Sequence, residues 1–161
     1  MKRFVVVAVL FALAVGPAFA HGADRGEAKA TVAGKTVVVD YGRPVLKGRD
    51  MLAQAEVGKP WRLGADAATT LKTDADLSFG GVSVPKGTYV LTATKVAADQ
   101  WVLTAATNDA AAKKVAEVPL TPSVLAADVE QFTIDLKADK DKGDLTLSWG
   151  KTALKATFTG K

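Results

Sequence analysis

The sequence predicts an all-β protein: a single antiparallel β-sandwich, or a partly open barrel, with one short helix, after a cleaved signal peptide. Three observations support this fold class. Apolar and polar residues alternate with a period of two along most of the chain, which is typical of half-buried strands. Turn-forming residues divide these runs into eight or so short strands at regular spacing. Helical spacing is confined to residues 47–60, apart from the alanine- and lysine-rich residues 108–116, where a helical turn is an alternative.

Residues 1–20 have the features of a secretory signal peptide. Lys2 and Arg3 form a cationic start, residues 4–15 are an unbroken apolar run, and Ala18-Phe19-Ala20 has the small-x-small form of a cleavage site. The apolar run is shorter than the ~20 residues that cross a bilayer. We therefore expect cleavage after Ala20, a mature chain without a membrane anchor, and a periplasmic or secreted location.

The rest of the chain is expected to form a leader and one domain. Residues 21–28 are polar and predict a flexible leader, and residues 29–161 predict the β-sandwich domain. Of the 21 basic residues, Lys2 and Arg3 fall in the signal peptide, which leaves 19 against 17 acidic residues and a formal charge of +2. Such dispersed charges offer no basic stripe for nucleic acid. The absence of cysteine excludes disulfides and thiolate chemistry.

The first strands are expected as a hairpin over residues 29–42 that turns at Ala33-Gly34-Lys35. Arg43-Pro44 ends the second strand, because proline cannot donate to a ladder. In residues 47–60, Met51, Leu52 and Ala55 have helical spacing and Gly58 and Pro60 follow. This segment is therefore the predicted short helix, or a single helical turn.

The middle of the chain predicts strands at residues 68–73 and 76–84, with Gly80-Gly81 as a tight turn or bulge. Pro85-Lys86-Gly87 predicts the turn of a further hairpin. The two prolines of residues 118–123 indicate an edge or a loop.

The last third of the chain predicts a meander of three half-buried strands. Its turns are expected at residues 137–144 and 150–152. The apolar positions alternate with polar ones in three sets: Phe132, Ile134 and Leu136; Leu145, Leu147 and Trp149; Leu154, Ala156 and Phe158.

Several chemistries lack the residues that they need. The one histidine is His21, so a Ser-His-acid triad and a multi-histidine zinc site are excluded. His21 at a mature N-terminus could chelate copper, but the second histidine of such a site is missing. Residues 139–144 imitate part of a calcium loop, but Gly143 and Gly150 stand where oxygen ligands are needed. No metal or cofactor is expected.

The segment between Tyr41 and Thr70 holds the candidate ligand-binding residues. Arginine supplies a planar fork of donors and tryptophan a stacking face, which together suit an anionic or sugar-like ligand. The candidates are Arg43, Arg49, Trp61, Arg62 and Asp66, and Lys47 and Lys59 lie among them. The alternative is structural: Arg62 pairs with Asp66, Trp61 caps the end of the sandwich, and Arg43 or Arg49 bonds loop carbonyls.

Six pieces of the chain resemble the domain of unknown function 2911 family of secreted bacterial proteins. They occur in family order, cover roughly residues 29–158, and read "YGRPVLKGRDML", "PWRLGADAATTL", "VSVPKGTYVL", "WVLTAATND", "VEQFTIDL" and "LTLSWGKT". The resemblance implies a secreted β-rich domain and no established activity. Two places depart from the family: Asp66-Ala67 stands where Asn-Glu is usual, and residues 109–116 are alanine-rich where the family has Trp-Gly and Tyr.

The sequence therefore favours a non-enzymatic binding or accessory module. Two alternatives stay open: a metal-independent hydrolase that uses a carboxylate pair, and a purely structural envelope protein. Nucleic acid is not an expected partner, and the oligomeric state is open.

Overall fold

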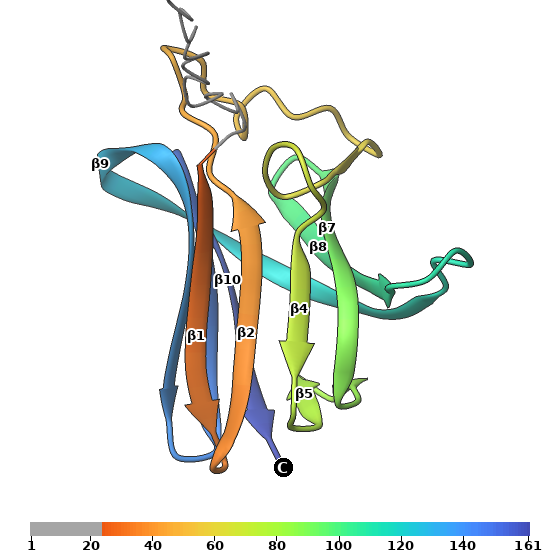
Figure 1. Ribbon diagram of the computed structural model, residues 1–161. Coiled ribbons are helices and arrows are strands. Elements are labelled where there is room, and N and C mark those ends of the chain that lie inside the picture. The colour runs from red at the N-terminus through yellow and green to blue at the C-terminus, as the bar shows by residue number, and fades with distance from the viewer. Residues whose placement is uncertain (1–23) are drawn as a thin grey trace, which may run out of the picture.

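The computed structural model describes residues 24–161, which form ten β-strands and no helix (Figure 1). Residues 1–23 lie outside the described part, and with them the expected signal peptide and His21. Nothing between residues 24 and 161 is a helix of the length and hydropathy needed to cross a membrane. The all-β prediction is confirmed.

The strands follow one hydrogen-bonded path in which every pair is antiparallel. The path runs β1-β2-β4-β7-β8-β9-β10-β5-β6, and β3 pairs with β7. The strands are β1 (Arg25–Val32), β2 (Lys35–Gly42), β3 (Pro60–Trp61), β4 (Thr70–Thr73), β5 (Leu77–Phe79), β6 (Val82–Val84), β7 (Gly87–Ala97), β8 (Gln100–Thr107), β9 (Lys114–Asp139) and β10 (Lys142–Gly160).

The predicted first hairpin is confirmed by β1 and β2, which pair from Val32–Lys35 to Arg25–Gly42. The two turn residues, Ala33 and Gly34, have φ values of 50° and 74°, as a two-residue turn between twisted strands requires. The first strand starts at Arg25, inside the segment expected to be a flexible leader. Arg25 is fixed there because its guanidinium pairs with Asp40 on β2.

The short helix predicted in residues 47–60 is wrong, whereas the alternative of one helical turn is confirmed at residues 51–54. In that turn Asp50 accepts from Ala53 N through its side chain (2.9 Å) and from Gln54 N through its carbonyl (3.1 Å). Only Leu52 of the three apolar positions is fully buried. One buried residue and one turn do not offset the cost of starting a helix.

The turn between β5 and β6 falls at Gly80-Gly81 as predicted. The hairpin predicted at Pro85-Lys86-Gly87 is wrong, because β6 pairs with β5 and β7 pairs with β4. The chain instead crosses between strands at this point. Asp76 holds the crossing by accepting from Lys86 N at 2.8 Å, and the Tyr89 hydroxyl donates to the Pro85 carbonyl at 2.7 Å.

Of the two alternatives for residues 118–123, an edge or a loop, the loop is wrong, because β9 runs straight through both prolines. Pro119 lies opposite Val102 of β8, and Pro122 lies opposite Leu154 of β10. Up to Leu120 the strand is paired with β8, and from Thr121 onward with β10. Each proline thus has a ladder partner on one side, which is the edge-like position that proline tolerates.

The C-terminal meander is present, with its last turn folded inside β10. This strand doubles back at Gly150, whose φ is 60°. The start and end of β10 consequently lie together: Gly160 N donates to the Asp141 carbonyl at 2.7 Å, and a Cβ on Gly143 would meet the ring of Phe158. The predicted turn at residues 150–152 therefore corresponds to a real reversal of the chain.

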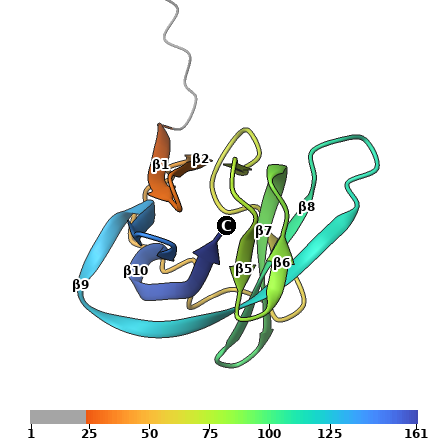
Figure 2. The same cartoon turned by 90° about the horizontal axis from the view of Figure 1, so that it is seen from below.

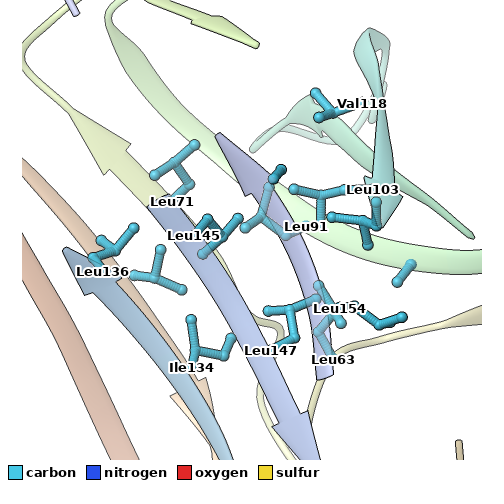
Figure 3. Close-up of a cluster of buried hydrophobic side chains, with 14 of the residues drawn as sticks. Leu63, Leu71, Leu91, Leu103, Val118, Ile134, Leu136, Leu145, Leu147 and Leu154 are labelled. Atoms are coloured by element: carbon cyan, nitrogen blue, oxygen red, sulfur yellow. The ribbon is translucent and has the colours of Figure 1, made fainter. Parts of the chain in front are cut away.

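The strands surround one hydrophobic core (Figure 2). Alternate residues of β4, β7, β8, β9 and β10 point into it, as Figure 3 shows for Leu71, Leu91, Leu103, Ile134 and Leu147. The first strand of the path, β1, lies against β9. Each fully buried leucine contributes roughly 1.5–3 kcal/mol relative to an exposed one. The core includes residues of both end strands of the path, Val32 of β1 and Val84 of β6.

Candidate functional site

The five predicted site residues all lie in the segment between β2 and β4, at the upper end of Figure 1. We call this the loop end: residues 43–69, together with the bend of β9 at 125–131 and the reversal at Gly150. The segment is fixed to β9 because Leu46 N donates to the Glu130 carbonyl (2.9 Å) and Phe132 N to the Pro44 carbonyl (2.9 Å). It is fixed to β10 because Asp50 packs against Gly150.

An aromatic cluster of Tyr41, Trp61, Phe132 and Trp149 lies beneath the loop end. The Trp61 ring stacks on Trp149 with centroids 5.7 Å apart and planes 14° apart, and it meets Phe132 edge-on at 4.9 Å. Tyr41 meets the other side of Phe132 at 5.6 Å. The indole nitrogen of Trp149 donates to the Glu130 carbonyl at 3.3 Å. Trp61 is therefore positioned by the fold, with part of its surface left exposed.

The stretch after Trp61 packs backbone against backbone on the end of β2. A Cβ on Gly42 would overlap the carbonyl oxygen of Ala65 and lie 2.7 Å from its nitrogen. A Cβ on Gly64 would lie 2.6 Å from the Gly42 oxygen. The buried Thr69 hydroxyl donates to the Leu63 carbonyl at 2.5 Å and closes the turn. Close packing against β2 therefore accounts for the small residues of this stretch, Gly64 above all.

Arg43 ties the beginning of the described chain to β9. Its guanidinium pairs with Asp24 at 3.5 Å, and Gln131 donates both to Asp24 (3.2 Å) and to the Arg43 carbonyl (3.2 Å). The Nε atom of Arg43 is buried and has no hydrogen-bond partner in the structure. The structural alternative expected a carbonyl partner for this side chain, whereas the structure gives it a carboxylate.

The remaining charged candidates do not gather around a pocket. Arg62 donates to the Asp66 carbonyl, within its own turn. Arg49 is exposed, and its side chain bonds no other residue between 24 and 161. Asp66 is exposed with a φ of 61°. None of the five pockets described for residues 24–161 is lined by any of the three arginines or by Asp66.

Trp61 does line a pocket, of about 250 Å³, which we call the Trp61 pocket. Its apolar wall is made by Leu52, Pro60 and Trp61, with Met51 partly exposed at the rim. Its polar groups are those of Gln54, Glu56 and Lys59, and the latter two form an ion pair at 3.6 Å. The complete lining is Met51, Leu52, Gln54, Ala55, Glu56, Lys59, Pro60 and Trp61.

A second pocket of about 350 Å³ shares Leu52 with the first, and we call it the Trp101 pocket. It lies between the turn that joins β7 to β8 and residues 122–124 of β9. Lys95, Asp99 and Trp101 line one side, and Ser123 and Val124 the other. Val124 is 86% exposed, which leaves this pocket with an apolar rim.

The largest pocket, of about 550 Å³, lies where β9 separates from β10. Its floor is made by Phe79, Val118 and Ala156, which are buried core residues. Its one charged lining residue, Lys155, is already paired with Asp144 at 2.8 Å. The pocket thus has an apolar floor and a neutralised cation, and it contains none of the predicted site residues.

The Asp144–Lys155 pair gives a pH prediction. The hydrogen bond from Lys155, supported by one from Thr157 at 2.9 Å, lowers the pKa of Asp144 from its usual 3.8. A lowered folded-state pKa stabilises the protein above the unfolded-state value, and this contribution disappears as the pH falls through the folded-state pKa. Both side chains are more than a third exposed (37% and 49%), so Asp144→Asn should cost only about 0.5 kcal/mol at pH 7.

Urea unfolding of the wild type and Asp144→Asn at pH 7 and pH 2 measures this difference. We expect it to be present at pH 7 and absent at pH 2. Asp74→Asn is the matched control, since Asp74 is an exposed acid that makes no ion pair within residues 24–161. An equal loss for both variants, or a loss that persists at pH 2, would contradict the assignment.

The described pockets do not provide the geometry of a carboxylate-pair hydrolase. In the five pockets, the acidic lining residues are Glu56, Asp74 and Asp99, each in a different pocket. Two acids facing each other across a cleft are what that chemistry needs. Residues 24–161 also hold no group of three or more acidic or histidine side chains close enough to share a metal ion.

Sequence reasoning missed most of the lining of both pockets. Gln54 and Glu56 belong to the segment that was predicted as a helix, and Lys95 and Asp99 flank a turn far along the chain. One feature of the sequence could have indicated a pocket here: large apolar residues are scattered between Gly48 and Pro60. Only Leu52 of these is fully buried, whereas Met51 is 43% and Val57 61% exposed.

These observations define an all-β protein with an aromatic-packed loop end and two small tryptophan-lined pockets at that end. The chain belongs to the family described as "protein of unknown function (DUF2911)", which matches residues 23–158. The family resemblance seen in the sequence is confirmed. No curated protein and no solved structure matches the chain.

Proposed function

We propose that the protein is a periplasmic or secreted, non-enzymatic binding module that takes a sugar ring in the Trp61 pocket. The observation that carries this proposal is the partly exposed Trp61, stacked on Trp149 and lining a pocket that also holds Gln54, Glu56 and Lys59. A stacking face with a few convergent polar groups is the usual composition of a small-ligand site. The sequence of residues 1–20 supports the location.

A sugar-like ligand is favoured over an anionic one. Arg43 and Arg62 are engaged by Asp24 and by the Asp66 carbonyl, and neither lines the pocket. The cation that does line it, Lys59, is balanced by Glu56. A pocket with one acid, one lysine and one amide offers both donors and acceptors to hydroxyl groups.

The fold proposed for this module is a β-sandwich. One layer is β1, β2, β4, β7, β8 and the first part of β9; the other is the rest of β9 with β10, β5 and β6. The continuous course of β9 from β8 to β10 supports this assignment. It leaves the loop end as the face where long connections between layers meet, which is where such domains carry binding residues.

Trp61→Ala tests the proposal. Wild-type and variant protein would be titrated by calorimetry with cellohexaose, chitohexaose and maltohexaose. We expect at least one sugar to bind the wild type and Trp61→Ala to weaken that binding at least tenfold, because central aromatic contacts dominate such sites. Circular dichroism would establish that the variant is folded.

Trp61→Phe is the control, since it keeps an aromatic face and should stay within a few-fold of the wild type. Val115→Ala, on the exposed start of β9, should change nothing. If no sugar binds the wild type, or if Trp61→Ala binds as tightly as the wild type, the proposal is wrong.

A further inference from the structure

The Trp61 and Trp101 pockets are neighbours, because Leu52 lines both of them. Leu52 is only 3% exposed, so it belongs to the buried wall that the two pockets share. The turn that carries Leu52 is held at both ends, by the bonds of Asp50 to Ala53 and Gln54 and by the packing of Asp50 on Gly150. A ligand that crosses Leu52 would therefore meet a fixed surface.

The two pockets also share residue types. The first combines the partly exposed Trp61 with Lys59 and Glu56, and the second combines Lys95 and Asp99 with Trp101, which is 5% exposed and forms part of the wall. Each adds neutral hydrogen-bonding side chains: Gln54 in the first, and Ser123 and Thr152 in the second. The two sets are joined through the backbone, because Gly58 N donates to the Lys95 carbonyl at 2.8 Å.

Their sizes suit one ring each. At about 250 and 350 Å³, the pockets lie on either side of the lower limit of roughly 300 Å³ for sites that hold a complete drug-sized ligand. Two adjacent single-ring pockets of like chemistry fit consecutive units of one linear polymer.

We infer that the Trp101 pocket is a second subsite, and that the ligand is a linear oligosaccharide of at least two rings that crosses Leu52. The inference rests on the proposed function. An apolar peptide is the less suitable occupant, because it would desolvate the Glu56–Lys59 ion pair and the charged groups of Lys95 and Asp99 without offering them hydrogen bonds. Ring hydroxyls can both donate to the acids and accept from the lysines.

A chain-length series tests the inference. The sugar that binds most tightly in the hexamer panel would be titrated as the monomer, dimer, trimer and hexamer. We expect affinity to rise at least tenfold from the monomer to the trimer and then to level off, since the two pockets accommodate a short segment. Binding that is independent of chain length would overturn the second subsite.

Filling the second pocket provides the matched comparison. Ala98→Phe and Val124→Phe place a ring in the Trp101 pocket from two sides, and both positions are exposed, so the fold should tolerate them. We expect either variant to bind the trimer no more tightly than the monomer, with monomer affinity unchanged. Ala110→Phe, on the exposed turn between β8 and β9, is the control.

The outcomes separate the two proposals. Binding that depends on Trp61 but is unaffected by chain length, by Ala98→Phe and by Val124→Phe overturns the second subsite alone. Failure of every sugar to bind, or binding that ignores Trp61, overturns the proposed function and the subsite with it. Tight binding of unstructured apolar peptides at the same pockets, with no sugar bound, would replace the ligand class.

Discussion

Replacing Gly42 with alanine should lower the free energy of unfolding by about 3 kcal/mol. The new Cβ would overlap the Ala65 carbonyl oxygen and lie 2.7 Å from the Ala65 nitrogen. Both atoms belong to the backbone. The packing is equally close in the other direction, since a Cβ built on Gly64 would lie 2.6 Å from the Gly42 oxygen. Neither chain can move aside without releasing the segment that carries Trp61. Urea unfolding followed by circular dichroism measures the loss.

Gly48→Ala is the control for the Gly42 substitution. Gly48 lies in the same loop end, and a Cβ there would meet nothing within 4 Å. Its φ of 76° is left-handed, so alanine should cost about 1 kcal/mol through backbone strain alone. Equal losses for the two variants would show that the contact between residues 42 and 65 is not close packing.

Phe132→Ala should cost about 4 kcal/mol, near the upper part of the range for removing a buried aromatic ring. Phe132 is 0% exposed and is the shared neighbour of Tyr41, Trp61 and Trp149, at 5.6, 4.9 and 5.8 Å. Its removal deletes three ring contacts at once and leaves a cavity under Trp61. Unfolding free energy and tryptophan fluorescence would both change.

Phe132→Leu separates the cavity from the ring contacts. Leucine keeps most of the volume and should cost about 1–1.5 kcal/mol. If the alanine and leucine variants were equally stable, the cluster would not be a packed unit. If Phe132→Ala left the fluorescence of the protein unchanged, Trp61 would not depend on Phe132 for its position.

Features set by residues close in the sequence could be predicted. The turns at Ala33-Gly34 and Gly80-Gly81 need residues that adopt positive φ. The alternation of Phe132, Ile134 and Leu136 with polar residues indicates which face of the strand is buried. These local patterns establish an all-β chain and many of its reversals.

Features that depend on strand partners could not be predicted. Proline is excluded from a strand that is paired on both sides, because it cannot donate to the second ladder. At Pro119 and at Pro122, β9 is paired on one side, so both prolines fit within the strand. Likewise, Pro85-Lys86-Gly87 has the composition of a hairpin turn, but the strands on either side of it do not pair with each other. Instead, β6 pairs with β5 and β7 pairs with β4. Helical spacing at Met51, Leu52 and Ala55 was outweighed because one turn was too short to propagate.

Of the five residues predicted for the site, Trp61 is the one that lines a pocket among those described for residues 24–161. The arginines line none of these pockets. A planar fork of donors serves equally well for a ligand and for the chain's own oxygens. Arg62 is occupied by the Asp66 carbonyl and Arg43 by Asp24. The spacing of residues in the sequence does not show whether an arginine binds a ligand or an oxygen atom of the chain itself.

Strand β9 also affects when the protein can acquire its structure. It closes the ladder of β8, receives the loop end at Glu130 and Phe132, and supplies the partner of β10. A chain that has emerged from the ribosome only as far as Thr107 has an open edge and no cover for its core. Because these contacts join residues far apart in sequence, folding should wait until synthesis is almost complete. A growing chain would then remain unfolded for most of its synthesis, which is the state that the proposed export would require.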